Sequence, residues 1–198
     1  MNFLAHCALA RSHPDLMVGG FLGDFLKGRI SAELPARVAD GVRLHRRLDA
    51  YSAEQPEIRH SVLRLPSELR RVAPVFVDLV ADHVLARRFA EWEGQSLSSF
   101  TRYTYQVLDD ARHLYPDPAR RFLDVMRTHD LLGAYTEPRV IERAFLHIAK
   151  RLHLTDIVAP AMATLRAQYA GFETDFSQYY PDLKSHTADW LAARETPG

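Results

Sequence analysis

Apolar residues recur every three or four positions along most of this chain, which is the spacing of one buried face of an α-helix. Proline and glycine separate these stretches. No alternation of apolar and polar residues, as in a strand, lasts more than a few positions. The pattern predicts an all-α fold with helices over residues 3–11, 16–28, 36–53, 57–65, 75–92, 97–113, 119–132, 140–152 and 155–180, then an amphipathic segment to about residue 193.

Prolines and glycines set the expected helix limits. Pro181 is predicted to end the longest helix, because proline lacks an N–H donor and its ring clashes with the preceding turn. The stretch 16–28 contains glycine at positions 19, 20, 23 and 28. Glycine weakens a helix but allows close backbone approach. That property suits a tight site around Asp24.

The length and composition indicate one domain. The chain has 198 residues, of which 47% are hydrophobic and 25% charged, as in globular proteins. Residues 1–194 are predicted to form a single compact multi-helix domain and 195–198 a frayed tail. Cys7 is the single cysteine, which excludes an internal disulfide and a thiolate zinc cluster, so we expect it to be a small core residue.

The compartment and partners are constrained by hydropathy and charge. No apolar run reaches the roughly 18 residues of a membrane span, and the first apolar stretch lacks the basic segment of a signal peptide. We expect a cytoplasmic protein without membrane insertion. Lysine plus arginine and aspartate plus glutamate both number 25, so the formal net charge is zero. Bulk attraction to nucleic acid is therefore not expected, and a charged partner must be bound by a local patch.

Two helical segments carry His and Asp at metal-ligand spacing. His45 and Asp49 are four residues apart and share one helix face. They can bind one metal together, or the carboxylate can orient the imidazole. Asp78 and Asp82 repeat this spacing, and His83 follows directly on an otherwise apolar helix. Buried carboxylates need a proton or a cation, and a divalent metal would supply the cation.

Two isolated polar residues add to this set. His6 is the one polar side chain of an apolar first helix, and Asp24 is the one acid of the glycine-rich stretch. Each alone is weak evidence, since a lone core histidine is more often a packing residue. Asp24 can equally cap a helix or pair with Lys27, and Asp49 can pair with a neighbouring arginine. Four such sites in the first half of the chain together favour a metal centre.

The second half of the chain is interpreted differently. His129-Asp130 is the one His-Asp dipeptide, but it lies at the end of an amphipathic segment, where both residues are unremarkable. We therefore exclude it from the site. The phosphate loop of Walker type, the nucleophile elbow around a serine and the dinucleotide fingerprint are all missing from the sequence.

Arginines flank both His/Asp segments. Arg43, Arg46 and Arg47 lie on the helix of the first pair, and Arg70 and Arg71 precede the helix of the second. They can form a solvated face with weak ion pairs. Alternatively, one arginine near the metal binds a phosphate in bidentate fashion, and the outward ones bind an acidic partner.

The same residues carry a resemblance to a known family. Residues 2–6, 20–28, 45–49, 70–74, 78–83 and 169–181 match in the expected order. The chain resembles the acyl carrier protein phosphodiesterases, also called holo-acyl-carrier-protein hydrolases. The resemblance implies a hydrolase of fatty acid and lipid metabolism. Such an enzyme removes the 4′-phosphopantetheine arm from holo-acyl carrier protein, an acidic helical substrate, and leaves the apo-protein with a free serine.

The resemblance also implies a fold and a site. These enzymes resemble the HD-domain metal-dependent phosphohydrolases as distant relatives. They prefer manganese, with magnesium or iron as alternatives. Expected metal ligands are His6, Asp24, His45, Asp78, Asp82 and His83. Expected catalytic residues are Asp24, His45, Arg46 and Asp49, and expected contacts to the carrier protein are Lys27, Arg43, Arg46, Arg47, Arg70 and Arg71. The order Asp82-His83 reverses the His-Asp order of HD proteins, so their ligand assignments do not transfer one by one.

Two other functions remain open from the residues alone. The first is an HD-like phosphohydrolase acting on a nucleotide or another small phosphoester, which needs no arginines for protein docking. The second is a non-catalytic helical binding module in which His and Asp are structural. A helix-rich chain of this size fits a monomer and a dimer equally well.

Overall fold

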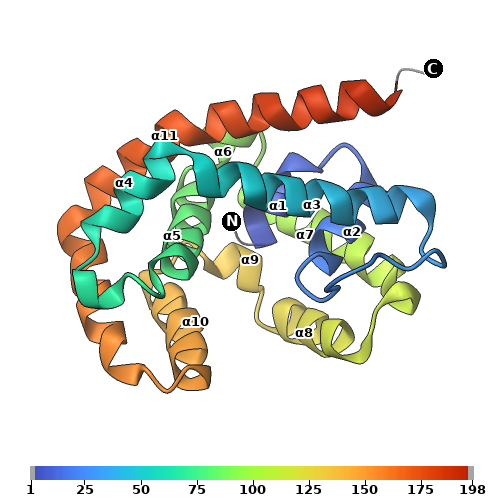
Figure 1. The fold of residues 1–198 in the computed structure, drawn as a ribbon. Helices are drawn as coiled ribbons and strands as arrows, with labels where there is room; N and C mark the ends of the chain where they lie inside the picture. The colour runs from blue at the N-terminus through green and yellow to red at the C-terminus, as the bar shows by residue number, and fades with distance from the viewer. Residues whose placement is uncertain (1–2, 196–198) are drawn as a thin grey trace.

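The computed structural model describes residues 3–195, which form helices joined by turns and loops, with no strand among them (Figure 1). The predicted all-α fold is therefore confirmed. The helices are α1 Phe3–Leu9, α2 Pro14–Leu22, α3 Ala36–Glu54, α4 Pro56–Arg64, α5 Ala73–Arg87, α6 Phe89–Glu93, α7 Leu97–Asp110, α8 Asp117–Thr128, α9 Leu131–Ala134, α10 Pro138–Arg151 and α11 Val158–Glu195, with short 3-10 turns at Ser67–Leu69, Arg112–Leu114 and Thr155–Ile157.

The short helix α1 lies in the interior and packs on α2 and α5. All of its residues from Leu4 to Ala8 are buried, Cys7 among them as expected. The long helix α11 extends along one side of the molecule and packs against α3, α4 and α5 (Figure 1). Among the described residues, no helix combines the length and the apolar character needed to cross a membrane.

Helices α2 and α3 cross with their backbones in contact. A Cβ atom on Gly19 would collide with the carbonyl oxygen of Val38, and one on Gly41 would collide with that of Leu16. Because neither position carries a side chain, the two backbones approach each other where a Cβ atom on either glycine would collide. This contact fixes the position of α3 against α2 and so of the residues that both helices carry.

Three predicted helices are shorter than expected or divided. The one over 119–132 is divided at His129 and Asp130 into α8 and α9. The other two are the helices over 16–28 and 75–92. The predicted helix over 16–28 ends at Leu22, and the glycine-rich residues after it form turns and a loop up to α3. The predicted helix over 75–92 is divided at Arg88, whose φ of −121° and ψ of 27° are not helical, into α5 and α6. In both places apolar spacing continues past the break, so the pattern alone did not reveal it.

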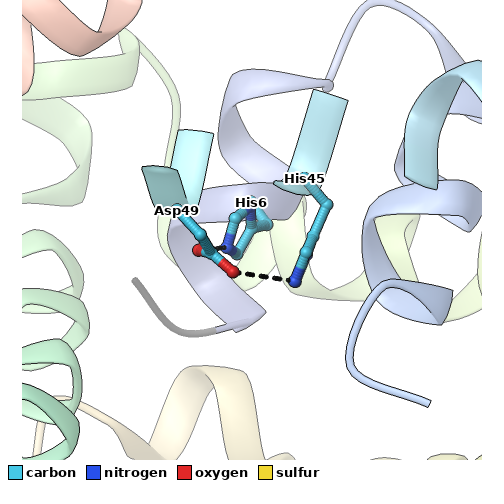
Figure 2. Close-up of side chains that lie close together, drawn as sticks. All are labelled: His6, His45 and Asp49. Atoms are coloured by element: carbon cyan, nitrogen blue, oxygen red, sulfur yellow. Dashed lines mark hydrogen bonds and ion pairs between the residues drawn. The ribbon is translucent and has the colours of Figure 1, made fainter. Parts of the chain in front are cut away.

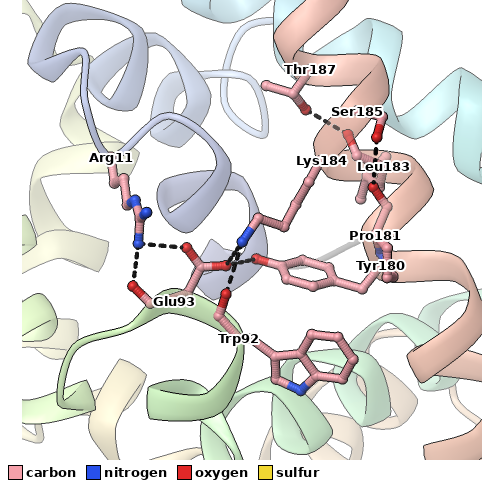
Figure 3. Close-up of polar contacts among 9 residues, drawn as sticks. All are labelled: Arg11, Trp92, Glu93, Tyr180, Pro181, Leu183, Lys184, Ser185 and Thr187. Carbon is pink, nitrogen blue, oxygen red and sulfur yellow. Dashed lines mark hydrogen bonds and ion pairs between the residues drawn. The ribbon is translucent and has the colours of Figure 1, made fainter.

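The expectation that Pro181 ends a helix is wrong, because α11 continues through it to Glu195. Tyr180 and Lys184, on either side of the proline, both contact the buried carboxylate of Glu93 (Figure 3). These contacts hold α11 on the core and offset the one backbone hydrogen bond that proline removes. The non-helical residue of α11 is Gln168 instead, with φ of −114° and ψ of 15°. Residues 196–198 of the predicted tail lie outside the described residues.

Candidate metal centre

Three side chains from two helices converge: His6 from α1, and His45 and Asp49 from α3 (Figure 2). One carboxylate oxygen of Asp49 lies 3.1 Å from Nε2 of His6, and the other lies 3.2 Å from Nε2 of His45. The two imidazole rings are stacked, with centroids 3.9 Å apart. Two nitrogen donors and one oxygen donor thus lie within 4.8 Å of one another.

The local sequence makes room for this arrangement. His45 and Asp49 share a face of α3 because they are four residues apart, as predicted. Gly23, directly after α2, leaves space for the imidazole of His45, since a Cβ atom there would overlap the ring. At Gly20, by contrast, a Cβ atom would meet Cβ of His6 at 3.9 Å, an ordinary contact. Of these two glycines, only Gly23 is required by the shape of the site.

Electrostatics hold His6 and Asp49 in forms that suit a cation. Burial, together with the nearby His45, lowers the pKa of His6 to about 3, so its ring is neutral near pH 7. Burial acts to raise the pKa of Asp49, but hydrogen bonds from His45 and His6 outweigh it and hold that pKa well below its usual range. A neutral imidazole and an ionised carboxylate are the forms that bind divalent metals.

The donor set fits a single divalent ion. Imidazole nitrogen and carboxylate oxygen are common ligands of manganese, iron and zinc, and three protein ligands leave further positions for water or substrate. Asp49 has an exposed side chain, while His6 and His45 are buried. The Nδ1 atoms of both rings are buried without a hydrogen-bond partner in the described part of the chain. Stacking and packing, rather than hydrogen bonds at Nδ1, therefore orient the rings.

Asp24 lies next to this group without belonging to it. It follows α2 and is exposed. Atoms packed around its carboxyl group raise its pKa; the charge of Asp49 raises it further, and His45 and Lys27 oppose this. These influences show that Asp24 lies within electrostatic reach of His45 and Asp49.

The two acids of α5 have different surroundings. Asp82 is fully buried and accepts hydrogen bonds from the backbone N–H groups of Leu4 at 2.8 Å and Ala5 at 3.0 Å. It therefore caps the first turn of α1 through the two residues that directly precede His6. Asp78 is partly buried, and burial raises its pKa, with the charge of Asp49 acting in the same direction. Neither acid is among the three residues whose donor atoms converge.

His83 also lies outside the group of three. Its Nδ1 hydrogen-bonds the backbone carbonyl of Tyr135 at 2.6 Å, and its ring packs edge-on against Tyr169 of α11. Its Nε2 is buried without a hydrogen-bond partner in the described part of the chain. Through these two contacts, His83 connects α5 with the segment after α9 and with α11.

The predicted arginine contacts are divided among several tasks. Arg46 donates to the carbonyl oxygens of Leu26 and Gly28, both at 2.8 Å, and so holds the loop that follows Asp24. Arg43 contacts Asp40 at 2.8 Å, and Arg47 contacts His186 of α11 at 3.1 Å. Three further predicted contact residues are exposed: Lys27, Arg70 and Arg71.

The dipeptide His129-Asp130 lies away from the cluster. His129 is exposed, and Asp130, with a φ of 43°, accepts a hydrogen bond from the N–H of Gly133 at the start of α9. This helix-capping position agrees with its exclusion from the predicted site.

Sequence reasoning missed a buried contact behind Asp49. Ser52, three residues further along α3, donates to the carbonyl of Leu48 and shares a hydrogen bond with the hydroxyl of Tyr179 on α11. Burial raises the pKa of Tyr179, with the charges of Asp78 and Asp49 nearby. A serine on the same face of α3 as Asp49 was the available signal, but Tyr179 resembled an ordinary core aromatic.

The fold and this cluster define an all-helical protein with a candidate metal site of two histidines and one aspartate. Comparison with known proteins specifies the family. A family model described as acyl carrier protein phosphodiesterase matches residues 1–183. A relative of the same description from Enterobacter sp. (strain 638) is 31% identical over 187 residues, covering 92% of this chain and 95% of the relative. One from Escherichia coli O157:H7 is 30% identical over 192 residues, covering 95% and 98% respectively.

The chain therefore belongs to the acyl carrier protein phosphodiesterase family, as the resemblance of its motifs predicted. This makes it a member of a family of phosphoric diester hydrolases. No solved structure matches the chain. The relation to HD-domain phosphohydrolases consequently stays a prediction.

Proposed function

We propose that this protein is a metal-dependent phosphodiesterase that hydrolyses the link between 4′-phosphopantetheine and a serine of holo-acyl carrier protein. The products are apo-acyl carrier protein and the free 4′-phosphopantetheine arm. The observation that carries the proposal is the convergence of His6, His45 and Asp49 in a chain of this family. The names of the relatives supply the substrate and the reaction class, and the donor set supports the metal.

His6 and His45 would hold the ion through Nε2, and Asp49 through its carboxylate. We expect manganese, with magnesium or iron as alternatives. A divalent ion at this position supplies positive charge for the phosphodiester oxygens and lowers the pKa of a water molecule. Asp82 supports the site indirectly, because it caps the turn of α1 that presents His6.

We assign proton transfer to Asp24. Burial raises the pKa of Asp24, which makes its carboxylate a stronger base, and it lies beside the group of three. It accepts a proton from the attacking water as the new phosphorus–oxygen bond forms. It returns that proton to the serine oxygen as the old phosphorus–oxygen bond breaks. Arg46 keeps the loop after Asp24 in place through the carbonyls of Leu26 and Gly28.

The direct test follows the intact mass of holo-acyl carrier protein incubated with the purified protein and Mn²⁺. We expect loss of the phosphopantetheine mass, and a chelator should abolish this loss. Retention of the full mass with manganese, magnesium and iron alike would contradict the proposed function. Hydrolysis of nucleotides without any action on the carrier protein would favour the small-phosphoester alternative instead.

A second test separates Asp24 from the metal ligands. Asp24→Ala should lower turnover at least about 100-fold, the lower end of the range for loss of one acid–base group, while manganese binding measured by calorimetry is retained. Asp49→Asn should instead weaken manganese binding itself, because it removes the anionic ligand. Glu54→Gln, at an exposed acid on the same helix as Asp49, serves as the control. Substantial turnover by Asp24→Ala would remove Asp24 from the catalytic residues.

A further inference from the structure

A hollow of about 570 Å³ lies between α3 and the C-terminal end of α11. Its walls include Arg43 and Arg47 of α3 and His186, Trp190 and Arg194 of α11. We propose that this hollow is the docking surface for an acidic face of the carrier protein substrate. The inference rests on the proposed function and adds the place where the protein part of the substrate binds.

The cationic side chains of the hollow are held in position. The guanidinium of Arg194 lies 4.0 Å from the ring centroid of Trp190. Arg47 donates through Nε to Nε2 of His186 at 3.1 Å, and the ring of His186 stacks on Tyr51 with centroids 4.1 Å apart. Side chains that are already ordered lose less conformational entropy when a partner binds.

The charge of the hollow favours an anionic partner. Arg43 lies 2.8 Å from Asp40, and Arg194 lies 3.7 Å from the same carboxylate oxygen. Two arginines thus share one carboxylate, and the partner of Arg47 is an imidazole nitrogen rather than a carboxylate. Asp189 also lines the hollow, which leaves three guanidinium groups against two carboxylates. Exposed guanidinium groups bind carboxylates in bidentate fashion.

The hollow and the metal site are carried by one helix. Arg43 and Arg47 alternate with His45 and Asp49 at two-residue steps, so the two pairs lie on roughly opposite sides of α3. A helix with its side chains is about 10–12 Å across, and a domain of about 100 residues has a radius of gyration of about 13 Å. A small carrier domain whose phosphodiester lies at the metal site can therefore reach across α3 to the hollow.

The wall of the hollow formed by α11 lies beyond residue 183, where the match to the family model ends. The residues that would bind the carrier protein on this side therefore lie outside the part of the chain that the family model describes.

The test uses a double charge reversal, Arg47→Glu with Arg194→Glu, in the full chain. Its matched control is Arg139→Glu with Arg166→Glu, which reverses two exposed arginines on α10 and the first half of α11. Steady-state kinetics with holo-acyl carrier protein and Mn²⁺ are measured at low and high salt. Binding of apo-acyl carrier protein is measured by fluorescence anisotropy. Circular dichroism and thermal unfolding show whether both variants fold.

We expect the double reversal to raise KM for the carrier protein and the Kd of its apo form by about tenfold or more at low salt, because like charges would face each other. The effect on KM should exceed that on kcat and should shrink at high salt. The control should differ from the wild type by less than about twofold, since its charges lie away from the hollow.

Three results would overturn the inference. One is an unchanged KM and Kd in the folded double variant. Another is an equal loss on a short peptide that carries phosphopantetheinyl-serine, because the effect would then arise in the metal site. The third is that the double variant keeps its affinity for the carrier protein and instead loses affinity for a second copy of this chain or for an oligonucleotide. If the wild type cleaves neither substrate, the proposed function fails, and the binding measurement still decides the docking surface.

Discussion

Asp49 is the residue on which the candidate metal centre depends, because its two oxygens face two different imidazoles. The sequence predicted the pairing of His45 with Asp49 from their spacing on one helix. From the residues alone His6 was a lone polar residue on an apolar helix, and the family resemblance placed it among the metal ligands. Its place beside His45 results from the packing of α1 against its neighbours, and spacing within one helix carries no information about that.

Gly23 offers a test at the scale of one residue. Gly23→Ala would place a methyl group on the ring of His45 and displace it. We expect manganese affinity to fall by about 10–100-fold, the range seen when support for a metal ligand is lost. Calorimetry on the purified chain measures this change.

The matched control is Gly20→Ala, on α2 three residues before Gly23, where the added Cβ meets its nearest neighbour at 3.9 Å. This variant should keep the wild-type affinity. Equal affinities in the two variants would show that the ring of His45 does not bind the ion.

At the scale of the elements, the histidine and acids of α5 show where prediction from sequence stopped. Asp78, Asp82 and His83 have the spacing of ligands, and they lie on a largely buried helix. Asp82 nevertheless faces the N-terminus of α1, and His83 faces Tyr135. The packing of the helices decides which helix end meets a given face of α5. The spacing of acids and histidine along α5 is therefore the same for a metal ligand as for a residue that caps another helix.

The cap on α1 predicts a dependence of stability on pH. Burial raises the pKa of Asp82 from 3.8 to about 7, so between these values the folded protein keeps a proton that the unfolded chain has lost. The contribution of Asp82 to stability is therefore full below about pH 4 and is lost as the pH rises through about 7. In Asp82→Asn, the part of the fall in the free energy of unfolding between about pH 4 and 7 that Asp82 causes should disappear.

Urea unfolding across this pH range, with a chelator present, measures the effect. Asp156→Asn, at an exposed acid of the turn before α11, is the control and should keep the wild-type slope. A wild-type slope in Asp82→Asn would mean that another group causes the pH dependence.

At the scale of the whole molecule, one buried carboxylate connects three distant segments (Figure 3). Glu93, at the end of α6, contacts Arg11 at 2.9 Å, Lys184 at 3.1 Å and the hydroxyl of Tyr180 at 2.9 Å. Its side chain is 2% exposed, whereas those of Arg11 and Lys184 are 38% and 39% exposed. The cations can therefore reach water if the acid is removed, but the acid cannot if the cations are removed.

This asymmetry predicts that Arg11→Met with Lys184→Met destabilises the protein more than Glu93→Gln does. Leaving a buried charge unpaired costs about 3–5 kcal/mol, whereas loss of hydrogen bonds to a charged group costs about 1.5–3 kcal/mol. Free energies of unfolding from urea titration decide the order. A larger loss in Glu93→Gln would contradict the account.

The all-α class and the family followed from apolar spacing and motifs along the chain. The length of α11 did not, because Pro181 is a strong stop signal when only local chemistry is considered. Contacts of Tyr180 and Lys184 with Glu93, about 90 residues earlier in the chain, outweigh that signal.

Helix α3 carries His45 and Asp49 on one side and Arg43 and Arg47 on the other, and Gly19 and Gly41 hold its backbone against α2. For protein engineering, this means that side chains of the two sides can be exchanged independently, but the helix cannot be shifted without altering both. Redesign for a new carrier should therefore alter surface residues on a fixed backbone. Loop grafts or insertions that move α3 would change recognition and catalysis together.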